Sequence, residues 1–397
     1  MLDFSRVLAG PHAGRMLADL GADVVKVEPP EGDMTRYAYP RRASIATYFT
    51  QQNCGKRNLS LDLKKPEALA LLHGLVDRAD VVLENFRPGV MDRLGLGPDD
   101  LRARNPRLVY CSITGYGHTG PWTGRRAYAP VVGAEAGVTW LQGQARHGEY
   151  ANDPLSHGDV YAGLEAVSGI LAALYHRERT GQGQWVELSM AETLLSVNEH
   201  VHWELRDDPE LTGDDDVPSF LPGDYPVLPT AEGHWVVIAG HPASNGTFER
   251  YCRAMERPDL IDDPRLSSVG DRRRNYALID AALAAWSSTF DDLDAIEEAF
   301  ATQGLAMGVL RTVREIGESD WASARGAVVD VSDRAGGIVR VPNSPWHFSA
   351  ADSGVRGEPA YRGEHNREIL AGMLGLDDES IDRLEADGVL SSRLPRA

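Results

Sequence analysis

Short apolar runs alternate with helical patterns through the first half of the chain. Runs rich in β-branched residues and four to seven residues long are typical of buried strands, and we expect strands at residues 2–7, 22–28, 81–84 and 108–113. Apolar side chains at helical spacing predict helices at residues 15–20 and 67–78, with a loop at 9–14 and loop-rich chain over 29–64. Strands that alternate with helices predict an α/β fold with a Rossmann-like, doubly wound parallel sheet. Ligands of such sheets bind in the loops that follow the strands' carboxyl ends.

The strongest helical pattern begins near Asp159. Residues 164–179 carry apolar side chains at helical spacing and end in a basic last turn, and Gly181 supplies a stop. Asp159 follows Gly158 at the start of this helix. An aspartate at that place is explained equally well as an N-cap, which favours the positive end of a helix. Taken alone, Asp159 therefore does not indicate catalysis.

The second half of the chain predicts a separate, smaller domain. Residues 207–224 are acidic and contain three prolines, which indicates an exposed linker between a large domain at 1–206 and an α+β domain at 225–325. The aspartates at 214–216 have no ligand partner at a metal-binding spacing, so we interpret them as solvated. Within the small domain we expect strands at 234–239 and 305–310 and helices at 246–255, 277–290 and 293–302. A further strand at 327–331 lies in a C-terminal segment, residues 326–397.

Composition narrows the class of protein. The chain has 397 residues and a formal net charge of -19, which argues against a nucleic-acid partner because phosphate neutralisation needs a basic face. Its three cysteines have no metal-binding spacing and are typical of free thiols in a reducing compartment. The sequence shows no leader and no apolar stretch long enough to span a membrane, so we expect a cytoplasmic protein without membrane partners. Any anionic substrate then needs a local positive field.

The first 28 residues imitate a dinucleotide-binding unit. They read strand, loop, helix and strand, and Glu28 closes the second strand. However, Pro11 and His12 stand where the dinucleotide fingerprint requires glycine, and the spacing is not GxGxxG. An NAD-dependent oxidoreductase is therefore a minor alternative, and we expect no NAD.

Motifs spread over the whole chain resemble those of the class III CoA-transferases, the CaiB/BaiF-type family. The matching segments, in the family's order, are residues 2–11, 20–28, 32–36, 56–64, 84–89, 115–117, 158–163, 180–184, 363–370 and 374–376. In similar enzymes an aspartate at the position of Asp159 attacks an acyl-CoA thioester, and an aspartyl anhydride and then an aspartyl-CoA thioester follow. A carboxylate suits this chemistry because an anhydride can pass its acyl group on. The resemblance implies a transferase that moves CoA from an acyl-CoA to a small carboxylic acid, without metal.

The resemblance also implies CoA contacts and an assembly. Residues that match the family's CoA-binding positions are Arg6, Val7, Ala9, Leu61, Lys64, Asn85, Phe86, Arg93, Leu94, Arg126 and Tyr128. The basic members of this set offer the local positive field that the overall charge lacks. Gly158 is expected to leave room for the thioester, and backbone N–H groups beyond Asp159 to hold its carboxylate ionised. Similar proteins form interlocked, ring-like homodimers in which the C-terminal segment returns to the large domain.

Some positions depart from the family. The related 2-methylacyl-CoA racemases carry a catalytic histidine at the place of Tyr128, and tyrosine is a poor base near neutral pH. The racemase remains an alternative in which His118 or His157 substitutes. Ala129 replaces a glutamate found in some transferases, and residues 241–246 lack the glycines of a flap found in others.

The identity of the acids stays open. Arg146, His147 and Tyr150 are candidates for binding an acid's carboxylate. A CoA-binding protein without catalytic activity is a further alternative, which would bind CoA but form no covalent intermediate.

Overall fold

The described chain divides into two compact units. The structure is a computed structural model that describes residues 1–146, 148–205 and 224–394. One unit comprises Met1–Val201 and Asp320–Ala397, and the other comprises His202–Ser319. The expected linker, residues 207–224 with its aspartate run, lies outside the described residues except for Asp224.

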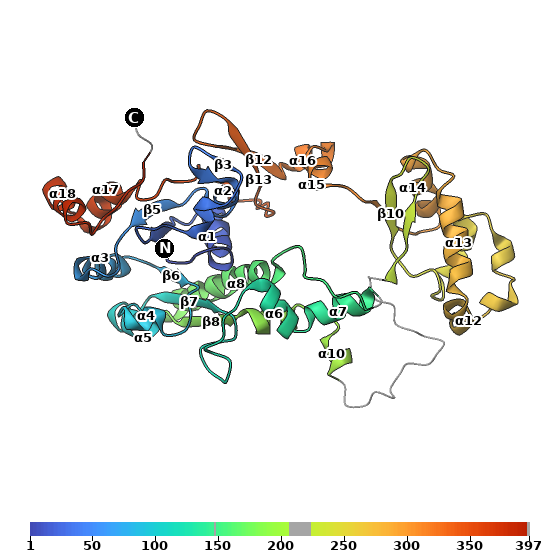
Figure 1. Cartoon of the computed structure of the whole chain (residues 1–397), viewed down its shortest axis with the longest axis horizontal. Coiled ribbons are helices and arrows are strands. Elements are labelled where there is room, and N and C mark those ends of the chain that lie inside the picture. Colours follow the sequence, from blue (N-terminus) through green and yellow to red (C-terminus); the bar gives the residue numbers. More distant parts are fainter. Residues whose placement is uncertain (147, 206–223, 395–397) are drawn as a thin grey trace. The chain divides into compact units, whose positions relative to one another are not determined.

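The first unit is built on a six-stranded parallel sheet (Figure 1). Its strands, in spatial order, are β5 (Arg57–Ser60), β2 (Val25–Glu28), β1 (Leu2–Asp3), β6 (Val81–Glu84), β7 (Val109–Thr114) and β8 (Trp185–Ser189). Leu2 pairs with Val25 on one side and with Val82 on the other. This is the doubly wound order, and it confirms the predicted α/β class. The strand order reverses between β1 and β6, so a ligand crevice is expected above these two strands.

Two apolar layers cover the sheet. On one face, helices α1 (Ala9–Asp19), α8 (His157–Thr180), α6 (Ala129–Glu135) and α9 (Met190–Ser196) bury a core that includes Leu83, Cys111, Ala166 and Ile170. On the other face lie α3 (Pro66–Val76), α5 (Pro98–Arg104) and the C-terminal helices α17 (Asn366–Ile369) and α18 (Asp378–Ala386). Alternate residues of each strand feed the two layers, as Val82 and Leu83 do.

The loop expected at residues 9–14 is a helix, so this prediction is wrong. The strand β1 ends at Asp3, and α1 begins at Ala9. Pro11 is tolerated because it lies in the first turn, where a backbone N–H has no partner within the helix. Gly10 has a packing role, since a Cβ there would lie 2.1 Å from the Cβ of Ser5.

Further short elements complete the first unit. They are η1 (Met34–Tyr37), β3 (Arg41–Arg42), β4 (Ile45–Ala46), α2 (Thr47–Asn53), α4 (Val90–Arg93), α7 (Val138–Ala145), α16 (Asp320–Arg325), β12 (Val328–Ser332), β13 (Ile338–Pro342) and η5 (Leu370–Leu374). The helix α2 falls in the region expected to be loop-rich. Its sequence carries no clear apolar period, and Phe49 packs against Ile45 and Tyr361 in a small core of its own.

The second unit has its own sheet and core. An antiparallel sheet in the order β11 (Met307–Val309), β10 (Trp235–Ile238) and β9 (Val227–Pro229) packs with α11 (Phe248–Ala254), α12 (Val269–Arg274), α13 (Tyr276–Ser287) and α14 (Leu293–Thr302). The chain of this unit also contains α15 (Val313–Gly317) and, from His202 on, α10 (Val201–Glu204). Tyr251, Phe300 and Leu283 are fully buried in its core. Among the described residues of both units, no helix is long and apolar enough to cross a membrane.

Candidate active site

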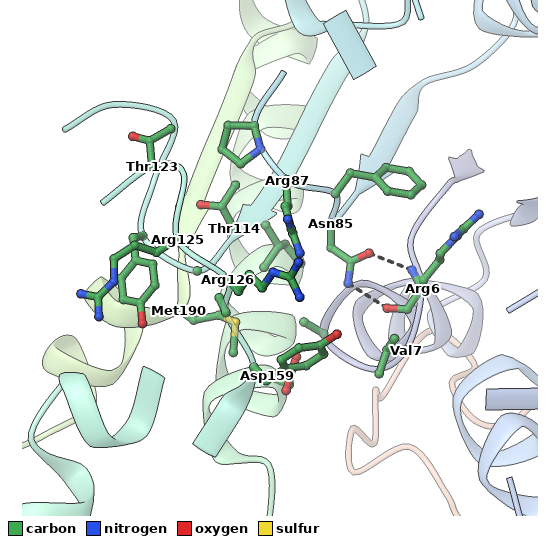
Figure 2. Close-up of a pocket in the computed structure, with 18 residues that line it drawn as sticks. Arg6, Val7, Asn85, Arg87, Thr114, Thr123, Arg125, Arg126, Asp159 and Met190 are labelled. Atoms are coloured by element: carbon green, nitrogen blue, oxygen red, sulfur yellow. Dashed lines mark hydrogen bonds between the residues drawn. The ribbon is translucent and has the colours of Figure 1, made fainter. Parts of the chain in front are cut away.

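A cavity of about 370 Å³ opens where the loops after β1, β6 and β7 meet, at the reversal of the strand order (Figure 2). It is lined by Arg6, Val7, Ala9, Asn85, Phe86, Arg87, Pro88, Ile113, Thr114, Gly115, Tyr116, Thr123, Arg125, Arg126, Ala127, Tyr128, Asp159 and Met190. Asp159 is the one carboxylate among these residues, while four of them are arginines. The cavity therefore combines one nucleophilic acid with a positive lining, although the whole chain is strongly acidic.

Asp159 does not cap its own helix. The N-cap residue of α8 is Ser156, and Asp159 is the third residue of the helix, within the first turn. The N-cap explanation considered from the sequence is therefore wrong. A carboxylate in the first turn still lies in the favourable field at the positive end of α8.

The carboxylate of Asp159 lies at the N-termini of two other helices, α1 and α6. It accepts hydrogen bonds from the backbone N–H groups of Ala9 and Ala129, the first residues of α1 and α6. These N–H groups have no partner within their helices, which leaves them free for an anion. The expected donors beyond Asp159 in α8 are thus replaced by donors from two other elements. Ala129 contributes through its backbone, although its side chain lacks the carboxylate of some relatives.

Burial decides the protonation of Asp159. Removal of the carboxyl group from water raises its pKa to about 6, and the two backbone hydrogen bonds act against this rise. At pH 7 roughly nine-tenths of the groups are still ionised. The group is therefore more basic than an exposed aspartate and remains available as a nucleophile.

Gly158, which is expected from the sequence to leave room for a thioester, lies in α8 where this helix packs against α9. It is buried, and a Cβ at this position would lie 3.3 Å from the Cε of Met190 and 3.4 Å from Leu194. A larger residue would require these two side chains to shift.

The loop after β1 is held by the loop after β6. The Nδ2 of Asn85 donates to the carbonyl of Arg6, and the Oδ1 of Asn85 accepts from the N–H of Arg6, both at 2.8 Å (Figure 2). The guanidinium of Arg6 lies 5.3 Å from the ring centre of Phe86, within reach of a cation–π contact. Val7 has a φ of 67°, which is unusual for a β-branched residue.

Seven of the expected CoA contacts line the cavity and four do not. Those in the lining are Arg6, Val7, Ala9, Asn85, Phe86, Arg126 and Tyr128. The side chain of Leu61 is fully buried in the core, so it offers no surface to a ligand. Leu94 packs against the same core, and Lys64 and Arg93 are exposed outside the cavity. The sequence match alone did not separate residues that support the binding loops from residues that face the cavity.

Several lining residues were missed from the sequence. Arg87 and Arg125 are the additional basic ones, and the others are Pro88, Ile113, Thr114, Gly115, Tyr116, Thr123, Ala127 and Met190. Arg125 pairs with Glu135 and lies over the rings of Tyr116 and Trp122. Arg87 and Arg126 have no ion pair among the residues that the structure describes, and both point into the cavity (Figure 2). For Arg87 a signal existed, because it directly follows Asn85 and Phe86 in the loop after a predicted strand.

Neither histidine considered as a racemase base lines the cavity. The Nδ1 of His157 contacts the carboxylate of Asp153, and its ring stacks on Tyr161 with 5.2 Å between ring centres. His118 packs edge-on against Trp185. A base must reach the proton that it abstracts, so this arrangement does not favour the racemase alternative.

Of the candidate acid-binding residues, the two that the structure describes do not line this cavity. Tyr150 stacks on Trp140, Arg146 is exposed, and His147 lies outside the described residues. The segment expected to replace a glycine flap, residues 241–246, belongs to the second unit. There His241 accepts a hydrogen bond from the N–H of Ala243, and burial lowers the pKa of His241 to about 4.

Comparisons with known proteins agree with one another. Residues 1–366 match the family model described as CoA-transferase family III. A succinyl-CoA–D-citramalate CoA-transferase of Chloroflexus aurantiacus is 33% identical over 98% of this chain and 96% of its own length. A succinate–glutarate CoA-transferase of Agrobacterium fabrum is 32% identical over 96% and 95%, and a formyl-CoA:oxalate CoA-transferase of Streptomyces avermitilis is 33% identical over 98% of both chains.

Solved structures point the same way. The crystal structure of a CAIB/BAIF family protein from Brucella suis is 31% identical, with a TM-score of 0.79 over 94% of this chain and 97% of that chain. The cavity with its single carboxylate and the family match over nearly the whole length lead to one conclusion: the chain belongs to CoA-transferase family III and is a CoA-transferase.

Proposed function

We propose that this enzyme moves CoA from an acyl-CoA to a small carboxylic acid through covalent intermediates on Asp159. The observation that carries the proposal is the placement of Asp159 as the one carboxylate lining the cavity, with a pKa raised to about 6. Relatives named for transfer from succinyl-CoA or formyl-CoA to small acids support small substrates on both sides.

The chemistry proceeds through two anhydrides. An oxygen of Asp159 attacks the thioester carbonyl of the donor, the C–S bond breaks, and the CoA thiolate leaves. The thiolate then attacks the Asp159 carbonyl of the anhydride, which releases the donor acid and forms an aspartyl-CoA thioester. The acceptor carboxylate attacks the carbonyl of this thioester, the C–S bond breaks, the CoA thiolate leaves again, and a second anhydride forms. Attack of the thiolate on the acceptor's carbonyl yields the new acyl-CoA and regenerates Asp159.

The lining residues have assigned parts in this scheme. The N–H groups of Ala9 and Ala129 hold one carboxylate oxygen of Asp159 while the other reacts. Arg6, Arg87 and Arg126 supply positive charge for the anionic substrates. Phe86, Tyr128 and the backbone at Val7 and Ala9 form the wall that meets the pantetheine end of CoA, and Lys64 and Arg93 attract its phosphates from outside the cavity.

We further propose a cytoplasmic homodimer of interlocked chains. The buried thiols of Cys54, Cys111 and Cys252 suit a reducing compartment. The helix α8 exposes Leu164, Leu171 and Tyr175, which lie at helical spacing on one side of the helix. An apolar row of this kind is suited to a second copy of the chain. Light scattering at several concentrations tests this proposal, and a monomer throughout would contradict it.

Intact-mass measurement after brief incubation with a panel of acyl-CoAs tests the covalent mechanism. We expect a mass gain of an acyl or CoA group that hydroxylamine removes and that Asp159→Ala lacks. Asp153→Asn is the matched control, because Asp153 is a nearby acid outside the cavity lining and its variant should still be labelled. No adduct from any acyl-CoA, together with solvent deuterium entering a 2-methylacyl-CoA, would overturn the transferase and favour the racemase.

A further inference from the structure

Buried polar side chains hold the backbone of the loop between β1 and α1. The N–H of Ser5 donates to Asp3 at 2.9 Å, and the carbonyl of Ser5 accepts from Lys26 at 2.8 Å. Asn85 holds both backbone polar groups of Arg6. The loop therefore has little freedom, because its polar groups are paired with side chains that are themselves packed.

Asp33 holds the next residue in a strained conformation. Its carboxylate accepts from the N–H of Val7 at 3.2 Å, is fully buried, and pairs with Lys26 at 3.2 Å. A β-branched residue with a φ of 67° is strained, so this conformation persists only where its surroundings impose it. Asp33 and Asn85 supply these surroundings. Such strain is typical of functional sites.

The strained loop leads directly to the nucleophile. Ala9, two residues beyond Val7, begins α1 and donates its N–H to Asp159. The direction of this N–H is set by the backbone of residues 5–8. We propose that Asn85 and Asp33 are positioning residues, which fix this loop so that the Ala9 N–H holds one oxygen of Asp159 in its reactive orientation.

This inference rests on the proposed role of Asp159 and changes the part assigned to Asn85. The sequence match made Asn85 a CoA contact. In the structure its Oδ1 accepts from the N–H of Arg6 and its Nδ2 donates to the carbonyl of Arg6. These two hydrogen bonds fix the orientation of the amide and hold the loop. A direct CoA contact and a positioning role predict different effects of substitution.

A positioning role predicts a change at Asp159 itself. The charged and titratable groups around Asp159 are Arg6, Arg87, Arg125, Arg126, Tyr116 and Tyr128 in the cavity lining, together with Tyr48 on α2, whose pKa rises through burial and the nearby charge of Asp159. Asn85→Leu alters none of these charges. If the Ala9 N–H moves away, the carboxylate loses a hydrogen bond, and its pKa rises.

The experiment compares Asn85→Leu with Asn366→Leu. Asn366 is a buried amide that, like the half-buried Asn85, is hydrogen-bonded to backbone groups, since it accepts from the N–H of Ser60 and donates to the carbonyl of Ser391, but it does not line the cavity. Carbon-13 NMR of protein labelled in aspartate carboxyl groups, assigned by difference with Asp159→Asn, gives the titration midpoint of Asp159. Steady-state kinetics give kcat and KM for acyl-CoA. Asn85→Ser serves as a milder second variant.

We expect the midpoint to rise by about 0.5–1 pH unit in both Asn85 variants and to stay unchanged in Asn366→Leu. We also expect kcat to fall at least about tenfold, with KM for acyl-CoA changing less than about threefold. An unchanged midpoint with a raised KM would overturn the proposal and make Asn85 a CoA contact. An equal shift of the Asp159 midpoint in Asn366→Leu would also overturn the proposal, because the shift would then come from a general loosening of the fold. Failure of the proposed function would show separately, as absence of acyl labelling in the wild type, while the NMR comparison still holds.

Discussion

Asp159 is governed by two opposed effects. Burial raises its pKa to about 6, while hydrogen bonds from Ala9 and Ala129 favour the charged form. A more basic carboxylate is a better nucleophile, and one that titrates below neutral pH is still ionised under working conditions. The cavity therefore raises the pKa of Asp159 without a second carboxylate in its lining.

The rate of the first chemical step should fall on acidification. The reactive form is the carboxylate, so kcat/KM for acyl-CoA should drop tenfold per pH unit below a midpoint near pH 6. Rates of acyl-enzyme formation measured between pH 5 and 8 check this expectation. A midpoint of the pH–rate profile near pH 4 would contradict it, because the carboxyl group would then behave as an exposed aspartate does.

Replacement of Asp159 by asparagine should stabilise the fold at alkaline pH. Because the folded-state pKa of Asp159 is raised, its stabilising contribution is present below about pH 4 and is lost as pH rises through about 6. Asp159→Asn lacks this loss and should be more stable than the wild type at pH 8 by on the order of 1–2 kcal/mol. Thermal melts at pH 8 and pH 4 measure the difference, which should shrink at pH 4. A variant less stable than the wild type at pH 8 would contradict this reasoning.

At the scale of elements, the contact between α1 and α8 sets the site. The two helices lie side by side on one face of the sheet (Figure 1). Gly163 allows this approach, since a Cβ there would lie 2.8 Å from the carbonyl oxygen of Ala9 and 3.2 Å from the ring of His12. The distance between α1 and α8 also determines how the Ala9 N–H meets Asp159.

Gly163→Ala should therefore reduce kcat by more than its loss of folding stability alone would explain. The added methyl group has to push α1 away from α8, which we expect to cost about 1–3 kcal/mol and to reduce kcat at least about tenfold. Gly133→Ala is the control, because Gly133 lies in α6 and a Cβ there meets nothing within 4 Å. Kinetics and thermal melts of both variants test the expectation. Equal activity in the two variants would show that the spacing of α1 and α8 does not control catalysis.

At the scale of the whole molecule, the C-terminal segment completes the first unit. The N–H of Gly363 donates to Asn58 at 2.6 Å, and Arg36 donates to the carbonyl of Ala360 at 2.9 Å. Side chains of the same segment fill the core beneath the sheet, namely Ile369, Leu370, Ile381, Val389 and Leu390. The parts of the chain before and after the second unit thus share one hydrophobic core.

Removal of residues 366–397 should abolish folding of the first unit. The five core side chains contribute roughly 1.5–3 kcal/mol each, which together is comparable to the whole stability of a typical domain. Leu370→Ala should cost only about 2–5 kcal/mol and serves as the graded control. Soluble yield and cooperative thermal unfolding are the measurements. A truncated chain that melts cooperatively close to the full chain would show that the segment is dispensable.

The sequence by itself determined the fold class and the family resemblance, and it singled out Asp159 as the candidate nucleophile. Buried β-branched runs such as residues 81–84 and the long helix at Asp159 carry local signals, because strand and helix periods are written in neighbouring residues. Local pattern failed at residues 9–14, where the proline and glycines suggested a loop. There the helix depends on its packing against Ser5 and against α8. The local pattern of residues 9–14 does not contain these contacts.

Only the tertiary structure decided which residues meet. The N–H donors to Asp159 come from Ala9 and Ala129, about 150 and 30 residues before it, and backbone groups leave no mark in a sequence. The same holds for Asn85, whose amide reaches Arg6, and for Arg87, which differs from other loop arginines only in pointing into the cavity. Side-chain types and local periods are properties of the chain, whereas proximity, burial and the resulting pKa of Asp159 arise only when distant segments pack together.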